Sequence, residues 1–139
     1  MIRPFQGLLD TSVIIDIEAI DPDNLPEKCF ISTVTLAELS VGPLVAKTIS
    51  EQMVRQVRLQ WSEQRFDPLP FDVACARTFA QVSVDLRFAG RKVASRSYDA
   101  MIAATAIAHN LPLYTLNPKD FSYISRLDVR TAPMNDGVR

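Results

Sequence analysis

The sequence predicts an α/β fold in which a parallel sheet is covered by helices on both faces. Two observations lead to this prediction. Short apolar runs that suit buried strands alternate along the chain with longer segments of helical periodicity, and strands that alternate with helices pair in parallel. Ligands of such sheets bind at the carboxyl ends of the strands, so a functional site is expected at that edge.

The chain begins with the order strand, helix, strand. Residues 7–10 form an apolar run that is typical of a buried strand, and the run leads into a helix that contains residues 13–15. Asp, Pro, Asp and Asn at residues 21–24 indicate a turn. A second strand is then expected at residues 29–32, because a short apolar run follows this turn.

Two helices are expected next. Residues 33–41 form a short helix that ends where Gly42 follows. Residues 45–65 are rich in polar side chains, but apolar ones recur at every fourth position, namely Ile49, Met53, Val57 and Trp61. This repeat predicts an amphipathic helix whose apolar stripe packs against the core of the protein.

The second half of the chain completes the sheet. Residues 66–70 contain two prolines, which exclude a helix and indicate a third short strand or an extended link. Helical periodicity returns over residues 73–88. Residues 97–110 are small and apolar on nearly every side, so they form a central helix. Strands are expected at residues 113–116 and, at the edge of the sheet, at residues 127–129.

The composition is that of one globular domain, residues 1–139. A length of 139 residues suits a single core, and 47% hydrophobic with 22% charged residues excludes a disordered chain. No signal peptide or membrane span is visible. Cys29 and Cys75 match no metal or redox spacing, so we expect buried thiols and a cytoplasmic location.

Four carboxylates fall where the carboxyl ends of the strands meet. Asp10 ends the first strand, Glu38 lies in the helix after the second strand, Asp99 opens the central helix, and Asp120 follows residues 113–116. Each acid also has an ordinary explanation as a helix cap, a capping-box partner, a dipole partner or a turn residue. Three of them, however, stand in apolar sequence, and burying several ionised carboxylates is costly unless they bind a cation.

The donor set favours a hard metal ion and hydrolysis of phosphodiesters. Oxygen ligands select Mg²⁺ or Mn²⁺. Zinc is not expected, because His109 is the only histidine and the cysteines are not clustered; we expect His109 to be structural. Such a metal polarises a phosphoryl oxygen and activates water. A net charge of −1 does not favour nucleic acid, but with four carboxylates neutralised by metal the charge becomes +3.

Four segments resemble, in order and spacing, the motifs of PIN-domain nucleases, and in particular of VapC-type toxins from bacterial toxin–antitoxin pairs. They are residues 8–15, 31–39, 98–106 and 111–121. The resemblance spans about residues 7–131. It implies a PIN-like three-layer α/β/α sandwich with a mostly parallel five-stranded sheet. Residues 132–139 would form a mobile tail.

The resemblance also implies an activity, a cofactor and partners. The activity would be a Mg²⁺- or Mn²⁺-dependent endoribonuclease in which Asp10, Glu38 and Asp99 hold the metal. Asp120 or the nearby Asn117 would complete the site. The implied supporting residues are Thr11, Ser12, Thr115 and Asn117. A small VapB-type antitoxin would cover a groove of the toxin. The toxin would form a homodimer and a hetero-oligomer with the antitoxin. Promoter DNA would bind only through the antitoxin.

Two surfaces remain open to more than one interpretation. A basic segment consists of Arg87, Arg91, Lys92 and Arg96. It either steers RNA toward the metal or forms an ordinary solvated loop. The stripe on residues 45–65 is expected to face the core, and the alternative is a groove for an antitoxin helix. An arginine of the antitoxin that pairs with the acidic cluster (Asp10, Glu38, Asp99 and Asp120) would inhibit the enzyme.

Rival functions are an RNA-processing nuclease without an antitoxin and an inactive RNA-binding module.

Overall fold

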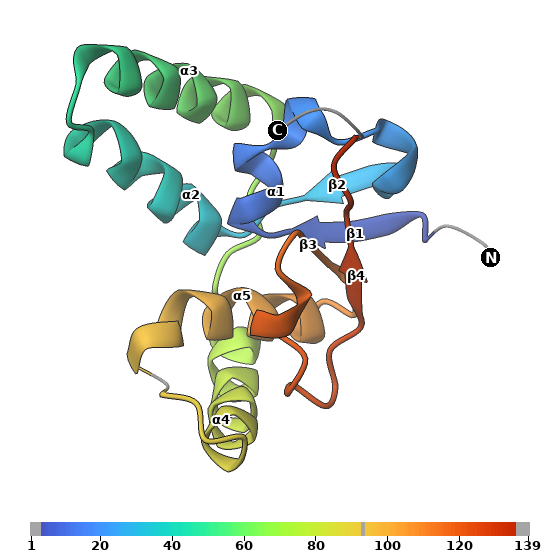
Figure 1. Cartoon of the computed structure of the whole chain (residues 1–139). Helices are drawn as coiled ribbons and strands as arrows, with labels where there is room; N and C mark the ends of the chain where they lie inside the picture. The colour runs from blue at the N-terminus through green and yellow to red at the C-terminus, as the bar shows by residue number, and fades with distance from the viewer. Residues whose placement is uncertain (1–3, 93, 136–139) are drawn as a thin grey trace.

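A computed structural model describes residues 4–92 and 94–135 of the chain (Figure 1). Over these residues the chain forms one four-stranded parallel sheet with the order β2-β1-β3-β4. The strands are β1 (Gln6–Leu9), β2 (Lys28–Phe30), β3 (Leu113–Thr115) and β4 (Val129–Thr131). The central strands β1 and β3 are nearly completely buried, which explains why their sequences are apolar rather than alternating.

Helices cover both faces of the sheet, as the sequence predicted. Their bounds are α1 (Thr11–Ile15), α2 (Thr33–Val41), α3 (Ile49–Arg65), α4 (Val73–Phe88) and α5 (Ser97–Ala108). Short 3₁₀ turns lie at Ile17–Ala19, Pro22–Asn24, Gly42–Val45, Ala94–Arg96 and Pro118–Asp120. None of the described helices is long and apolar enough to cross a membrane.

Successive side chains of β1 enter different cores. Leu8 belongs to a cluster with α4 and α5, whereas Leu9 belongs to a second cluster with α1 and Leu39 of α2. This division follows from the strand geometry, in which neighbouring side chains point to opposite faces. Tyr114 packs directly over Gly7, where there is no room for a side chain: a Cβ at this position would lie 2.7 Å from Tyr114 Cε1.

The segment 66–70 pairs with the sheet at one point. Leu69 forms a single parallel bridge with Ser32, in which Leu69 N donates to Ile31 O and Thr33 N donates to Leu69 O, both at 2.9 Å. The segment is therefore an extended link with one bridge. Pro68 and Pro70 explain this limit, because proline has no N–H to extend the ladder.

The apolar stripe of α3 faces solvent, so the prediction that it packs against the core is wrong. Ile49 is 76% exposed, Met53 and Val57 are each 64% exposed, and Trp61 is 38% exposed. The helix contacts the body through another face, with Leu59 against the second core and Ser62 fully buried. Helices α2 and α3 form a pair that extends away from the sheet (Figure 1), which leaves the stripe uncovered.

The C-terminal segment is also packed more closely than the sequence suggested. Ala132 is fully buried, and its N–H donates to Thr115 O at 3.0 Å. Met134 forms an antiparallel bridge with Ile20, and Asn135 N donates to Ala19 O at 2.7 Å. Backbone bonds to distant segments thus connect residues 132–135 to the rest of the domain. Residues 136–139 lie outside the described part of the chain.

Candidate active site

Asp10 lies where β1 ends and α1 begins, and hydroxyl groups surround its carboxylate. The residue is only 5% exposed. Oδ1 accepts hydrogen bonds from Val13 N at 3.2 Å and from Ser12 Oγ at 2.5 Å, and Oδ2 accepts one from Thr115 Oγ1 at 2.6 Å. Asp10 is thus the N-cap of α1, and the same carboxylate is a member of the acidic cluster.

The two hydroxyls that bind Asp10 are themselves fixed by the loop after β3. Ser12 Oγ accepts from Leu116 N at 3.1 Å, and Thr115 Oγ1 accepts from Asn117 N at 2.9 Å. Each hydroxyl therefore donates to the carboxylate and accepts from the backbone, which fixes the direction of its proton. The predicted contacts of Ser12 and Thr115 with the cluster are present, and Asn117 takes part through its backbone N–H.

Glu38 reaches the same edge of the sheet from α2. Thr11 Oγ1 donates to Glu38 Oε1 at 2.7 Å and lies 3.1 Å from Thr35 Oγ1. The N-cap of α2 is Ser32, whose Oγ accepts from Thr35 N at 3.0 Å. Glu38 is therefore not the capping-box partner of Thr35, and its ordinary structural explanation does not hold. Sequence reasoning missed Thr35, which carries no signal beyond its place in the second motif.

Asp99 stands in the first turn of α5 and is half-buried. Its pKa is raised from 3.8 to about 6, first by burial and then by repulsion from Asp120, Asp10 and Glu38, while Arg96 opposes the rise. The four predicted acids are thus close enough to repel one another. This repulsion favours any cation that enters between them.

Burial also raises the pKa of the other two core acids. For Asp10, burial outweighs the hydrogen bonds from Ser12, Thr115 and the backbone, which lower the pKa. For Glu38, burial is again the largest cause; the bond from Thr11 lowers the pKa, and the charge of Asp10 raises it. In all three acids, therefore, burial leaves the ionised carboxylate less solvated than it would be in water.

Asp120 lies at the rim of the cluster and is held by a cation. Arg96 Nη1 donates to Asp120 Oδ1 at 2.6 Å, and the two side chains are 27% and 36% exposed. This hydrogen bond is the main reason that the pKa of Arg96 is raised. Arg96, which the sequence assigned either to RNA steering or to a solvated loop, pairs its guanidinium with an acid of the cluster.

The other cations of the basic segment lie in the last turn of α4 and in the loop that follows it. Arg96 lines a hollow together with Glu38 and Asp99, whereas the guanidinium of Arg91 lies 4.7 Å from the centre of the Tyr123 ring. Arg87 lies exposed in the last turn of α4, and Lys92 is also exposed. Val93, between this group and Arg96, lies outside the described residues.

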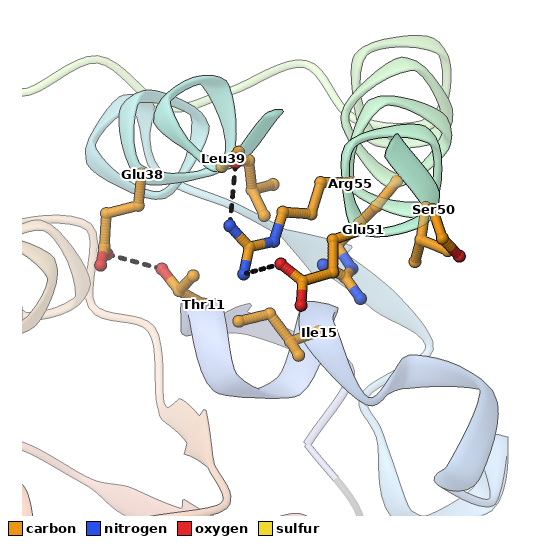
Figure 2. A pocket seen from close by; sticks show the side chains of 10 residues that line it. Thr11, Ile15, Glu38, Leu39, Ser50, Glu51 and Arg55 are labelled. Atoms are coloured by element: carbon orange, nitrogen blue, oxygen red, sulfur yellow. Dashed lines mark hydrogen bonds and ion pairs between the residues drawn. The ribbon is translucent and has the colours of Figure 1, made fainter. Parts of the chain in front are cut away.

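Two further arginines lie on the other side of Glu38. A cavity of about 490 Å³ is lined by residues that include Thr11, Glu38, Arg55 and Arg58. The first three of these side chains are labelled in Figure 2. Arg55 Nη1 donates to Gly42 O at 3.0 Å, and Nη2 lies 3.9 Å from a carboxylate oxygen of the same helix. The sequence did not identify these arginines, because cations on an amphipathic helix follow no motif.

The donor set fits a hard divalent cation. The acids and the hydroxyls around them offer only oxygen atoms, as Mg²⁺ and Mn²⁺ prefer. Among the described residues, no three of these carboxylates bring oxygen atoms within 4.8 Å of one another. Mg²⁺ commonly binds one or two carboxylates directly and reaches others through its water ligands, so it does not require three carboxylates in contact.

Comparison with known proteins identifies the family. The PIN domain profile matches residues 7–127. Ribonuclease VapC4 of Mycobacterium tuberculosis is 38% identical over 127 residues, which are 89% of this chain and 93% of that protein. The chain belongs to the PIN-domain family, among its VapC-type ribonucleases. The resemblance that the four motifs carry is therefore confirmed.

Solved structures agree on the fold of this PIN domain. The VapBC-5 toxin–antitoxin structure from Mycobacterium tuberculosis superimposes with a TM-score of 0.80 at 33% identity, over 94% of this chain and all of that one. VapBC2 from Rickettsia felis, bound to a fragment of its promoter DNA, gives a TM-score of 0.77 at 25% identity, over 92% of this chain and 99% of that one. The α/β fold with a parallel sheet is the fold of these proteins.

Proposed function

We propose that this PIN domain hydrolyses RNA phosphodiester bonds with Mg²⁺ or Mn²⁺ bound at the acidic cluster. Asp10 and Asp99 would contact the ion directly, and Glu38 and Asp120 directly or through water. The observation that carries the proposal is the convergence of the buried Asp10, the Thr11-bound Glu38 and Asp99 at one edge of the sheet, where burial and three acidic neighbours raise the pKa of Asp99. A cation removes this repulsion and keeps all four groups ionised.

The residues of the chain would position the reacting groups. Once bound, the ion would polarise a phosphoryl oxygen and lower the pKa of an attacking water. Ser12 and Thr115 hold the carboxylate of Asp10 by bonds of 2.5 and 2.6 Å, and Thr11 holds Glu38 at 2.7 Å. These hydroxyls fix the ligands before the ion arrives, so little reorganisation is needed on binding.

The cations around the cluster would bind the phosphates that flank the cleaved bond. Arg96 lines one hollow that includes Glu38, and Arg55 and Arg58 line a second cavity that also includes Glu38; Arg55 is labelled there in Figure 2. An RNA strand that crosses Glu38 would therefore meet a positive charge on each side of the metal. Phosphate contacts of this kind position a strand without reading its sequence.

We also propose that a VapB-type antitoxin covers the exposed stripe of α3. The stripe borders a groove of about 800 Å³ that is lined by Met53, Val57 and Trp61 together with residues 14–19. An amphipathic helix would bury these side chains, and an arginine beyond that helix would reach the acids. VapBC2 of Rickettsia felis was solved with promoter DNA; here DNA would bind through the antitoxin, and the toxin would form a homodimer.

We further propose that residues 7–131 form the core of a single PIN domain with three layers. The fifth strand implied by the resemblance would be limited to one bridge at Leu69, which makes both of its bonds, because Pro68 and Pro70 prevent a longer ladder. Main-chain amide exchange would test this: protection at Leu69 equal to that of β2 supports a fifth strand, and rapid exchange contradicts it.

RNA cleavage tests the nuclease proposal. Purified protein would be mixed with a labelled pool of random-sequence RNA and Mg²⁺ or Mn²⁺, with EDTA as the metal-free arm. We expect Asp10→Asn and Asp99→Asn to lower the cleavage rate by about 100-fold or more, since even indirect partners of a metal contribute 10–100-fold. Asp67→Asn, an exposed acid outside the cluster, is the control. Equal rates in all variants would show that the metal assignment is wrong.

Co-expression with a VapB-type antitoxin, encoded by a small gene that neighbours this one, would test the partner proposal. We expect the antitoxin to co-purify with the parent and with Gln56→Glu, but not with Val57→Glu. Both variants add one charge to α3, and only Val57 lies in the groove. Retention of the antitoxin by Val57→Glu would place its binding surface elsewhere. RNA cleavage without any antitoxin binding would instead favour an RNA-processing nuclease.

A further inference from the structure

A second group of side chains of metal-ligating types lies at the C-terminal end of α5, opposite to the end that carries Asp99. Asp72, Cys75 and His109 each offer one ligand atom, and these atoms all lie within 4.8 Å of one another. Within the described residues, this is the one set of three or more acidic, cysteine or histidine side chains with that spacing. His109 follows Asp99 by ten residues, so the helix separates the group from the acidic cluster by about 15 Å.

The fold brings the three residues together from two helix ends. Asp72 is the N-cap of α4, and its Oδ1 accepts from Cys75 N at 3.0 Å. Cys75 stands in the first turn of the same helix, and His109 is the C-cap of α5. Thirty-odd residues separate Cys75 from His109 along the chain, so no linear motif connects them. The sequence argument against zinc considered the histidine and the two cysteines alone, and did not foresee that Asp72 would lie beside Cys75 and His109.

The ordinary roles of these residues leave one atom unexplained. The N-cap hydrogen bond explains the presence of Asp72. Packing explains the presence of Cys75, whose buried thiol lies 3.7 Å from Pro70 O. His109 Nε2, however, is buried and has no hydrogen-bond partner among the described residues. Buried polar atoms nearly always have a partner, so the ring has a binding capacity that packing alone does not use.

The chemistry of the group points to a borderline metal and not to Mg²⁺. A thiolate, an imidazole and a carboxylate are the three ligand types of Zn²⁺ in proteins, and a site with three protein ligands keeps its fourth position for water. Hard ions such as Mg²⁺ select oxygen ligands instead. Asp72 is exposed whereas Cys75 is fully buried, so the ion would enter from the Asp72 side.

We propose that Asp72, Cys75 and His109 form a zinc site that joins the start of α4 to the end of α5. These two helices pack extensively against each other and cover one face of the sheet. Zinc would therefore stabilise the folded chain. The site does not share ligands with the acidic cluster, so zinc binding and RNA cleavage are separable.

Cobalt titration of the whole chain tests this site directly. Metal-free protein would receive excess Mg²⁺ to occupy the acidic cluster and would then be titrated with Co²⁺ as a spectroscopic substitute for Zn²⁺. We expect one equivalent to give the near-ultraviolet absorption of a cobalt–thiolate bond, and Zn²⁺ to remove that absorption. Absence of the band in the parent protein would overturn the proposal.

Variants assign the ligands. Cys75→Ala should lose the band, and His109→Gln should weaken Zn²⁺ affinity by about 100-fold or more, since even second-shell changes weaken metal binding by 10–100-fold. Asp72→Asn keeps an equally good helix cap and should also weaken Zn²⁺ binding. Cys29→Ala and Asp99→Asn are the controls and should bind Zn²⁺ like the parent.

Thermal unfolding gives an independent readout. Zn²⁺ should raise the melting temperature of the parent and of Cys29→Ala, and should leave that of His109→Gln unchanged. If Cys75→Ala does not fold, His109→Gln and Asp72→Asn still decide the question, because both side chains are partly or fully exposed. A band that persists in Cys75→Ala, or one that disappears in Cys29→Ala, would contradict the assignment.

Discussion

Replacement of Asp99 by Asn should stabilise the metal-free protein while it removes activity. Asp99 repels three other carboxylates and is half-buried, so its ionised form is unfavourable in the folded state. Asn keeps the size of the side chain and removes the charge. An increase in stability on loss of a functional group is typical of a site that is strained until its ligand binds.

The raised pKa of Asp99 sets the size of the expected stabilisation. At a pH above both pKa values, the rise from 3.8 to about 6 means that the ionised side chain destabilises the folded state by about 3 kcal/mol, because each pKa unit represents 1.36 kcal/mol. The side chain is partly exposed, so solvent screening reduces this value to about 1–1.5 kcal/mol. For a chain of this length the melting temperature should rise by roughly 3–6 °C.

The pH dependence follows from the sign of the change. Because the folded pKa is higher than the unfolded one, the stability that the protonated Asp99 contributes is complete below pH about 4 and is lost as the pH rises through about 6. Asp99→Asn should therefore exceed the parent most clearly above pH 7, and the difference should shrink toward pH 4.

Thermal unfolding in EDTA at pH 7.5 and at pH 4.5 provides the assay. Asp67→Asn serves as the matched control, because surface substitutions of this kind usually change stability by less than about 0.5 kcal/mol. Added Mg²⁺ should stabilise the parent and not Asp99→Asn. If Asp99→Asn is no more stable than the parent at pH 7.5, repulsion among the carboxylates is not a property of this site.

Two further changes test the surroundings of the cluster. Thr115→Val keeps the shape of the buried side chain but removes its hydrogen bond to Asp10. It should lower the free energy of unfolding, measured in urea, by about 1.5–3 kcal/mol. It should also raise the pKa of Asp10, which shifts the acid limb of the pH profile of RNA cleavage to higher pH. Arg96→Gln breaks a partly exposed ion pair and should change stability by less than about 1 kcal/mol. Because Arg96 lowers the pKa of the neighbouring Asp99, its loss should also shift that acid limb upward.

The acidic cluster could be predicted from sequence because its members are tied to strand ends. Asp10 follows an apolar run directly, and the parallel topology places the carboxyl ends of β1 and β3 at one edge. The hydroxyl partners were harder to predict: Thr11, Ser12 and Thr115 came only from the resemblance, and Thr35 was missed because it lies in an apolar helix like an ordinary residue. Their roles depend on contacts between segments that only the fold brings together.

The features that the sequence could not predict depend on what covers a surface. The four-residue period of α3 establishes an apolar stripe, but the same stripe suits a core and a binding groove equally. The packing of Ala132 and Met134 depends on backbone bonds to distant residues, and no periodicity records them. The convergence of Cys75 and His109 has the same origin, since it requires α4 and α5 to be docked.

The partners of the buried acids explain why the site retains its charge. A lysine or arginine bonded directly to the carboxylate of Asp10 or Glu38 would neutralise it and compete with a metal. The chain instead places hydroxyls there: Ser12 and Thr115 for Asp10, and Thr11 for Glu38. Hydroxyls lower the pKa of each carboxyl without supplying a positive charge, and burial still raises that pKa above its ordinary value. Such a site holds its carboxylates in place and leaves their negative charge to be balanced by a cation from solution.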